Sequence, residues 1–224
     1  MTRQVETIRL APGTFVERPS IEQVLTLRED WDGKTALHGL LSVGAVAVPL
    51  LTEHARQVAY AGSWKSAFRH ITTGAKPHSE YFSCNNPTEK CFGILQQTAA
   101  LLLARKLGIG TFATPLEFNQ HDLRIYPKGS RGLRIHRDKR KYKNLVLVIL
   151  LEGDGEFSVY QNCDRTTRRI ITAREGDGII MRAPGLLGPG EEQPLHDLDN
   201  VELGRYVYML RQVTPEESLH ETDY

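Results

Sequence analysis

The run Leu145-Val146-Leu147-Val148-Ile149-Leu150-Leu151, followed directly by the turn Gly153-Asp154-Gly155, is the strongest structural signal in this chain. A short apolar run that ends at a turn signal is typical of a buried β-strand. Asp-Gly is also a strong signal for a tight turn between strands. The sequence therefore predicts a strand over 145–151 at the centre of a β-rich region.

Similar short runs surround this strand throughout the second half of the chain. They are rich in Val, Ile, Leu and Tyr, are separated by turn signals such as Gly176-Asp177-Gly178, and cover 123–126, 156–161, 168–173, 178–182 and 205–213. Closely spaced strands that follow a helical segment predict an α+β protein. Its C-terminal half is expected to be a β-sandwich or jelly roll.

The first half of the chain reads differently. A helix is predicted from just after Pro87 to about Leu107, because apolar residues recur there at spacings of three and four; they are Phe92, Ile94, Leu95, Ala99, Leu102 and Leu103. Residues 1–35 predict an irregular arm with one short strand, and their role is not predicted. Residues 44–51 predict a buried strand that ends near its proline, after which Thr52 is placed to cap a short helix.

Length and composition favour one soluble domain. The chain has 224 residues, of which 40% are hydrophobic and 25% charged, and its net charge is +1, which gives no global argument for a nucleic-acid partner. We expect a helical brace over 1–114, a jelly-roll core over 115–213 and a tail over 214–224. No apolar run approaches the roughly 20 residues of a membrane helix, and no secretory signal begins the chain. The expectations are therefore a cytoplasmic protein with no membrane partner, and an oligomeric state that the sequence leaves open.

Two histidines and one carboxylate form the candidate metal site. His136 and Asp138 are two residues apart, and side chains at that spacing leave the same face of a strand; His196 follows sixty residues later. Two imidazoles and one carboxylate can occupy one face of an octahedral Fe(II) and leave three positions open. A structural zinc site would need a fourth ligand. The alternative is structural: a solvated turn around His136 and Asp138, and an ordinary loop histidine at His196.

The order of these features resembles the Fe(II)/2-oxoglutarate-dependent dioxygenases over roughly 115–213. The likeness is greatest to the AlkB-like branch, which shares a run from a Tyr-x-Pro-Gly-like turn (Tyr126-Pro127-Lys128-Gly129) into His-x-Asp, and the spacing from Arg205 to Arg211. The resemblance implies a double-stranded β-helix with supporting N-terminal helices. It also implies Fe(II), 2-oxoglutarate and O₂ as cofactors and cosubstrates.

The resemblance also implies roles for single residues. His136, Asp138 and His196 correspond to the iron ligands, and no catalytic residue is implied beyond them. Arg205 corresponds to the basic residue that pairs with the distal carboxylate of 2-oxoglutarate, for which a guanidinium is well suited. Tyr126 corresponds to a tyrosine that reaches the same cosubstrate, and Arg211 to a second arginine near the metal. By contrast, we interpret His121-Asp122 as structural, because adjacent strand residues face opposite ways.

Three departures from the AlkB-like pattern bear on the substrate. Val207 and Met209 stand where that branch keeps Asn and Thr, Arg124 stands where it has Asn, and the short gap from His196 to Arg205 is closer to small-molecule hydroxylases. The prediction is therefore hydroxylation of a small organic molecule. One alternative is AlkB-like oxidative demethylation of nucleic acid, which the basic stretch 131–143 favours unless it is only a solvated surface. Another is a non-catalytic jelly-roll module that binds a ligand.

Overall fold

The computed structural model describes residues 7–11, 14–17, 25–27, 38–43, 52–53, 55–56, 65–66, 82–85, 90–107, 114–160, 166–183, 186 and 193–214. Only the backbone is described in the strands before residue 90. The buried strand expected over 44–51 lies outside the described residues. Thr52-Glu53 and Ala55-Arg56 are helical, as the sequence predicts for the residues around Thr52.

One long helix and fourteen strands make up the described elements. In chain order they are β1 (Thr7–Ala11), β2 (Thr14–Glu17), β3 (Leu25–Leu27), β4 (His38–Val43), β5 (Lys65–Ser66), β6 (Phe82–Asn85), α3 (Lys90–Leu107), β7 (Gln120–Tyr126), β8 (Leu133–His136), β9 (Tyr142–Gly153), β10 (Glu156–Tyr160), β11 (Arg169–Ile171), β12 (Asp177–Arg182), β13 (Leu195–Asp199) and β14 (Arg205–Val213).

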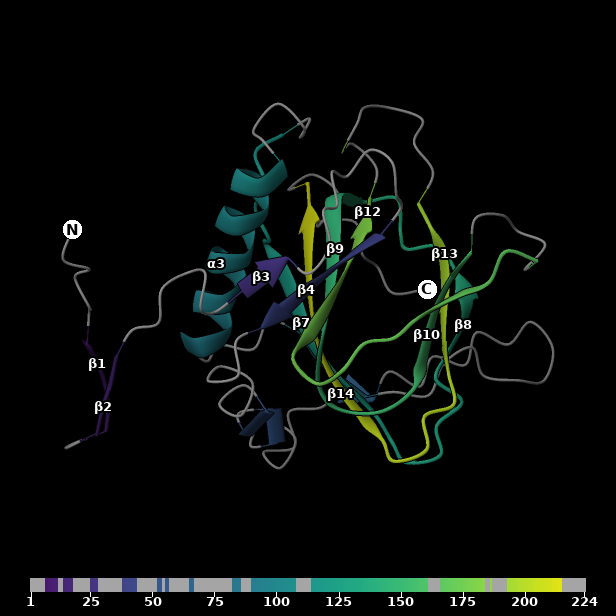
Figure 1. Ribbon diagram of the computed structural model, residues 1–224, viewed down its shortest axis with the longest axis horizontal. Helices are drawn as coiled ribbons and strands as arrows, with labels where there is room; N and C mark the ends of the chain where they lie inside the picture. The colour runs from purple at the N-terminus through teal and green to yellow at the C-terminus, as the bar shows by residue number, and fades with distance from the viewer. Residues whose placement is uncertain are drawn as a thin grey trace.

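Two antiparallel sheets face each other and form the body of the molecule. The larger sheet has the order β3-β4-β12-β9-β14-β7-β6-β5, and the smaller one has the order β11-β10-β13-β8. Figure 1 shows α3 on one side of the larger sheet and β8, β10 and β13 on the other. Strands β1 and β2 form a separate hairpin. The fold is α+β with a double-stranded β-helix, as the sequence predicts.

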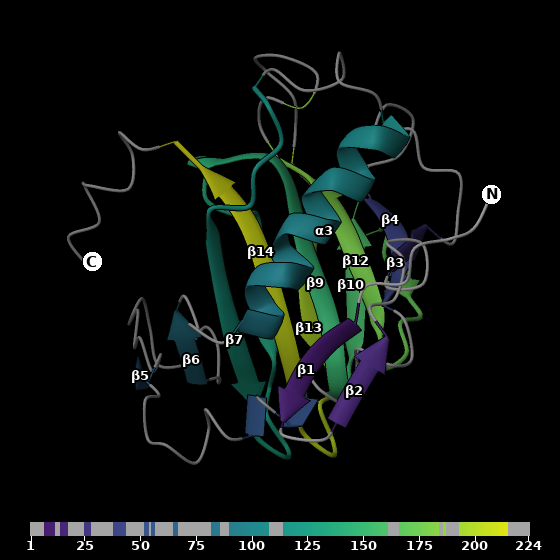
Figure 2. The ribbon, with the colours of Figure 1, turned by 90° about the vertical axis from the view of Figure 1, so that its left-hand side faces the viewer.

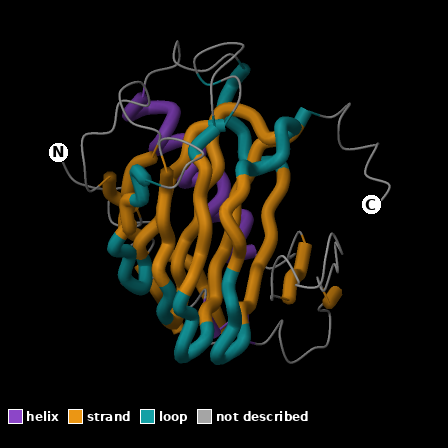
Figure 3. Tube along the Cα trace, turned by 90° about the vertical axis from the view of Figure 1, so that its right-hand side faces the viewer, coloured by secondary structure: helices purple, strands orange, loops and turns teal. Residues whose placement is uncertain are grey.

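Strand β9 explains why the sequence signal at 145–151 is so strong. Its odd-numbered residues from 145 to 151 belong to the hydrophobic cluster under α3, whereas Val146, Val148 and Leu150 belong to the cluster between the two sheets. Because successive side chains on a strand leave opposite faces, a strand that is buried on both faces needs an unbroken apolar run. The inner cluster receives Phe157 and Leu198 from the smaller sheet. Figure 3, viewed from the opposite side to Figure 2, shows the strands in front of the helix.

Helix α3 covers the outer face of the larger sheet, in front of β9 and β14 (Figure 2). Phe92, Leu95, Ala99, Leu102 and Leu103 are buried, as their spacing predicts. The expectation that Ile94 belongs to this face is wrong, because its side chain is 45% exposed. Each residue turns a helix by about 100°, so position 94 lies well outside the arc that these five residues define.

The strands predicted for the second half of the chain are confirmed as β7, β9, β10, β11, β12 and β14. Sequence reasoning missed β8 and β13. It also predicted one short strand within residues 1–35, where the structure has β1, β2 and β3. Strands β3 to β6 extend the larger sheet, so the first half supplies strands as well as a helix. No helix in the described part of the chain has the length and hydropathy needed to cross a bilayer.

Candidate functional site

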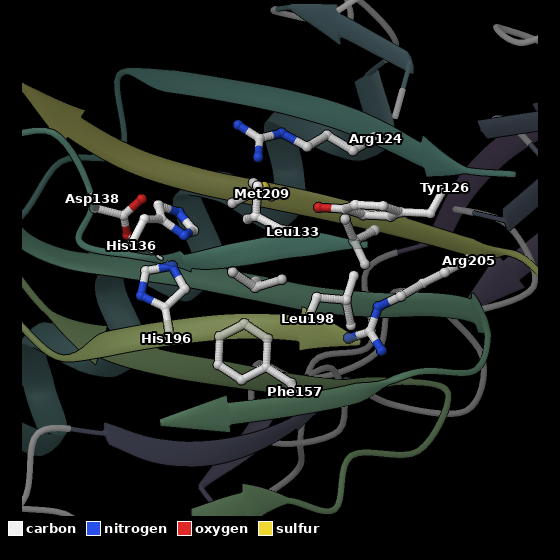
Figure 4. Close-up of a pocket in the computed structure, with 12 residues that line it drawn as sticks. Arg124, Tyr126, Leu133, His136, Asp138, Phe157, His196, Leu198, Arg205 and Met209 are labelled. Atoms are coloured by element: carbon white, nitrogen blue, oxygen red, sulfur yellow. Dashed lines mark ion pairs between the residues drawn. The ribbon is translucent and has the colours of Figure 1, made fainter. Parts of the chain in front are cut away.

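A pocket that is partly open to solvent lies between the two sheets (Figure 4). Strands of both sheets contribute side chains to it, because alternate residues of each strand face the interior. The lining consists of Arg124, Tyr126, Leu133, His136, Asp138, Val148, Phe157, His196, Leu198, Arg205, Val207 and Met209. In Figure 4 the two histidines and Asp138 lie at one end of the pocket, and Arg205 lies toward the other.

The structure brings His136, Asp138 and His196 together. His136 and His196 are direct partners across β8 and β13, and their ring centroids are 4.3 Å apart. One potential ligand atom from each of the three residues lies within 4.8 Å of the other two. His196 Nε2 is 3.9 Å from Asp138 Oδ2. The sequence predicts that His136 and Asp138 share one face of a strand, and this is wrong. Strand β8 ends at His136, and Asp138 lies in the following loop.

Backbone carbonyls fix the orientation of both imidazoles. His136 Nδ1 donates to the carbonyl of Arg134 at 2.8 Å, and His196 Nδ1 donates to the carbonyl of Pro194 at 3.1 Å. A neutral imidazole that donates through Nδ1 keeps a lone pair on Nε2, which is the arrangement of a metal-binding histidine. Phe157 stacks on the His196 ring at 5.5 Å and restricts its rotation further.

Burial keeps the imidazole of His136 neutral. It lowers the pKa of His136 to about 4, with a further contribution from the neighbouring His196, whereas Asp138 acts in the opposite direction. Metal ligation requires an unprotonated imidazole, so this environment prepares the site for a cation near neutral pH. Two nitrogen donors and one carboxylate on one face are the donor set expected of a non-haem Fe(II) site. The residues present therefore fit the metal that the sequence predicts.

Arg205 is the first residue of β14 and is only 1% exposed. Its Nη1 donates to the carbonyls of Asp154 at 3.1 Å and Gly155 at 3.2 Å, whereas its buried Nε has no hydrogen-bond partner. The Asp154 carboxylate accepts from the Leu203 amide, and Arg205 forms no ion pair with a carboxylate of the described residues. Burial lowers the pKa of Arg205 to about 10. A buried guanidinium that has no carboxylate in ion-pair contact is a ready binding group for the carboxylate of a ligand.

Two glycines allow the β9–β10 turn to reach Arg205. Gly153 has φ +97°, and a Cβ there would lie 1.9 Å from the carbonyl oxygen of Gly204. Gly155 has φ +117°, and a Cβ there would lie 3.0 Å from Leu198. Both positions therefore favour glycine sterically and conformationally. The Gly-Asp-Gly turn, a signal of local structure in the sequence, also supplies the carbonyls that hold the arginine.

Tyr126 reaches the same pocket from β7. It is the direct cross-strand partner of Arg205 and is buried. Figure 4 shows its hydroxyl directed into the pocket, between the Arg205 end and the end that holds the two histidines. The structure therefore brings together five of the six residues predicted from the sequence.

The sixth, Arg211, is not among the residues that line the pocket. It is 2% exposed and forms a buried ion pair with Asp122, and its guanidinium lies 4.9 Å from the centre of the Tyr142 ring. Burial alone would raise the pKa of Asp122, but Arg211 and Arg124 outweigh it and lower that pKa. Arg211 already has a carboxylate partner within the fold, which argues against a role in cosubstrate binding, and that role stays a prediction.

Sequence reasoning gave no functional role to Arg124, which lines the pocket. The available signal was its position two residues before Tyr126 on the same strand, which places both side chains on the interior face. The basic stretch 131–143 behaves differently. It contributes Leu133, His136 and Asp138 to the pocket, whereas its basic side chains do not line it, and most of them are exposed.

No protein-family model and no curated protein sequence matches this chain. Solved structures do match it. A prolyl-4-hydroxylase from Pseudomonas putida is 14% identical with a TM-score of 0.62, over 82% of this chain and 96% of that one. A Trichoplax adhaerens prolyl hydroxylase, solved with a peptide fragment of hypoxia-inducible factor, is 11% identical with a TM-score of 0.64, over 90% and 93%.

A third structure, an oxidoreductase of the 2OG-Fe(II) oxygenase family from Burkholderia pseudomallei, is 12% identical with a TM-score of 0.53, over 80% of this chain and 85% of that one. At such identities the likeness concerns the fold. The superfamily expected from the sequence and its AlkB-like branch both stay predictions. The chain therefore has the double-stranded β-helix fold of the 2OG-Fe(II) oxygenases.

Proposed function

We propose that this protein is an Fe(II)- and 2-oxoglutarate-dependent dioxygenase that hydroxylates an organic substrate. One observation carries the proposal: a single interior pocket has two chemically distinct ends. A cluster of two imidazoles and one carboxylate lies at one end, and a buried arginine without a carboxylate partner among the described residues lies at the other. A 2-oxo acid with a second, distal carboxylate is complementary to this pair of ends.

His136, Asp138 and His196 would hold the metal. Fe(II) bound there would supply the activation of O₂, coupled to decarboxylation of 2-oxoglutarate to succinate and to oxidation of the substrate. The contribution of the chain is to present the three donors in fixed orientation. The carbonyls of Arg134 and Pro194 do this for the two rings, since outer partners of this kind orient metal ligands.

Arg205 would bind the distal carboxylate of 2-oxoglutarate. A guanidinium can contact a carboxylate through two parallel hydrogen bonds and stays charged when buried, and two backbone carbonyls already hold this one in place. The Tyr126 hydroxyl would add a hydrogen bond from the opposite strand. Apolar side chains from both sheets, among them Leu133, Val148 and Leu198, would keep water away from the reacting groups.

Hydroxylation of a small organic molecule is the outcome that we propose. Solved structures with this fold include prolyl hydroxylases, for which carbon hydroxylation is the named activity. Demethylation of nucleic acid receives no comparable support, because the net charge is only +1 and the basic side chains of 131–143 do not line the pocket. Binding of nucleic acid therefore stays a prediction.

The test is O₂-dependent formation of succinate from 2-oxoglutarate by the purified protein with Fe(II) and ascorbate. We expect slow turnover without a prime substrate, and its loss in His136→Ala. Arg140→Gln, which removes an exposed cation from the loop after Asp138, should leave turnover unchanged. Absence of succinate together with absence of a visible charge-transfer band under anaerobic 2-oxoglutarate would instead identify a non-catalytic binding module.

A further inference from the structure

Arg124 is a second cation in the pocket wall, on strand β7. Its cross-strand partner on β14 is Val207, two residues along each strand from the pair of Tyr126 with Arg205. The pleat directs Arg124, Tyr126, Arg205 and Val207 toward the interior. In Figure 4 the Arg124 guanidinium lies, along the length of the pocket, between the metal-ligand cluster and the Tyr126 hydroxyl.

Asp122 holds the Arg124 side chain in this place. Arg124 Nε donates to Asp122 Oδ2 at 2.8 Å, and the Arg124 side chain is 14% exposed. The other carboxylate oxygen of Asp122 accepts from Arg211. This contact uses the Nε–H of Arg124. In Figure 4 the two terminal nitrogens lie on the side of the metal-ligand cluster.

Arg124 lines the same pocket as His136, Asp138 and His196. Arg205 lies toward the opposite end (Figure 4). A ligand that extends from Arg205 to the metal ligands would therefore lie next to the Arg124 guanidinium close to the metal-ligand cluster.

We propose that Arg124 binds the carboxylate next to the oxo group of 2-oxoglutarate, so that two arginines grip the two carboxylates of one molecule. The proposal rests on the proposed function and assigns to Arg124 a task separate from that of Arg205. Arg205 selects the distal carboxylate, which distinguishes 2-oxoglutarate from simple 2-oxo acids. Arg124 contributes equally to every 2-oxo acid, because they all share the proximal carboxylate.

Two ligands separate these tasks. 2-Oxopentanoate has the chain length of 2-oxoglutarate with a methyl group in place of the distal carboxylate. The affinity of each ligand is measured anaerobically on the Fe(II)-loaded protein by calorimetry and by the visible charge-transfer band. Arg124→Gln should weaken both ligands by a similar factor of about 10 to 100, the range for one charged hydrogen-bonded contact. Arg205→Gln should weaken 2-oxoglutarate alone, Arg124→Lys should restore part of the affinity, and Arg140→Gln should change neither ligand.

Asp122 keeps its pair with Arg211 in Arg124→Gln, so this variant should fold, and thermal unfolding verifies it. Unchanged affinity for both ligands would overturn the role of Arg124, and so would a loss confined to 2-oxoglutarate, since that would place Arg124 on the distal carboxylate. A wild-type protein that binds Fe(II) but neither 2-oxo acid would contradict the proposed function itself.

Discussion

Arg205 and Arg211 lie on the same strand, and the contrast between them separates a ligand site from a structural ion pair. Both are almost fully buried. Arg211 has the Asp122 carboxylate and the face of Tyr142. Burial alone would lower its pKa, but Asp122, Tyr142 and Asp138 together outweigh burial and raise it. Arg205 has two backbone carbonyls, and burial lowers its pKa to about 10. A buried cation is thus structural where the fold supplies a carboxylate, and points to a ligand where it does not.

The largest effect is expected from Asp122→Asn. Removing one partner of a buried pair leaves an uncompensated charge, which typically costs about 3–5 kcal/mol. We therefore expect a loss of that order in the free energy of unfolding, measured with urea. Arg211→Met in the same background should recover part of the loss, because the buried positive charge that lost its carboxylate partner is then removed. A change below about 1 kcal/mol in Asp122→Asn would remove the distinction between the two arginines.

Acid should destabilise the metal-free protein through His136, at the opposite end of the pocket from Arg205. The unfolded chain takes up this proton near pH 6.5 and the folded protein only near pH 4, so the unfolded state binds more protons between those values. The stability is fully present above about pH 6.5 and should fall by up to about 3 kcal/mol as the pH drops to 4.

Urea unfolding at a series of pH values measures this decline, and His136→Gln should remove it. Asp122 contributes to the pH dependence of stability in a separate, more acidic pH range. Because its pKa in the folded protein is lowered, its contribution is present above its ordinary pKa of 3.8 and is lost only below that value. A decline between pH 6.5 and 4 that persists unchanged in His136→Gln would show that another group is responsible.

Arg205→Met should weaken the binding of 2-oxoglutarate without a loss of stability, whereas Asp122→Asn should chiefly lower the free energy of unfolding. We expect the affinity for 2-oxoglutarate to fall about 10- to 100-fold, which corresponds to about 1.4–2.8 kcal/mol. The free energy of unfolding should stay equal or rise slightly, because an apolar side chain replaces a buried cation that has no carboxylate partner in the described structure. Calorimetry and urea unfolding measure the two quantities. A loss of stability comparable to that of Asp122→Asn would contradict the assignment of Arg205 to a ligand.

The smallest effect is expected at an exposed pair. Arg168 contacts Glu156 at 3.1 Å, and both side chains are more than one-third exposed. Solvent screens such pairs, so Glu156→Ala, which leaves the hydrogen bond from Arg168 to Ser158 in place, should change the free energy of unfolding by about 0–1 kcal/mol. The same urea measurement gives this value. A loss as large as that of Asp122→Asn would mean that burial is not what distinguishes the pairs.

The sequence could not distinguish Arg205 from Arg211, because the distinction depends on a residue far away in the chain. Both arginines begin or end apolar stretches of one strand, and the resemblance assigned both to the cosubstrate. What separates them is the register of β14 against β7, which places Asp122 beside Arg211 and Tyr126 beside Arg205. Local pattern carries no information on which residues of two distant strands become partners.

The long strand β9 and the helix α3 could be predicted because their signals are local and repeated. Strands β8 and β13 could not, since both are short and mix polar with apolar residues, and those polar residues include His136 and His196. The resemblance still identified these two histidines, although the physical argument for Asp138 placed it on a strand that ends two residues earlier. Strand propensity failed at the positions of the proposed metal ligands.

Anaerobic titration of 2-oxoglutarate into the Fe(II)-loaded protein tests most directly whether this pocket holds both groups. We expect a saturable visible charge-transfer band in the wild type, a midpoint shifted about 10- to 100-fold upward in Arg205→Met, and no band in His136→Ala. A wild type without the band, or an Arg205→Met variant with an unchanged midpoint, would contradict this expectation.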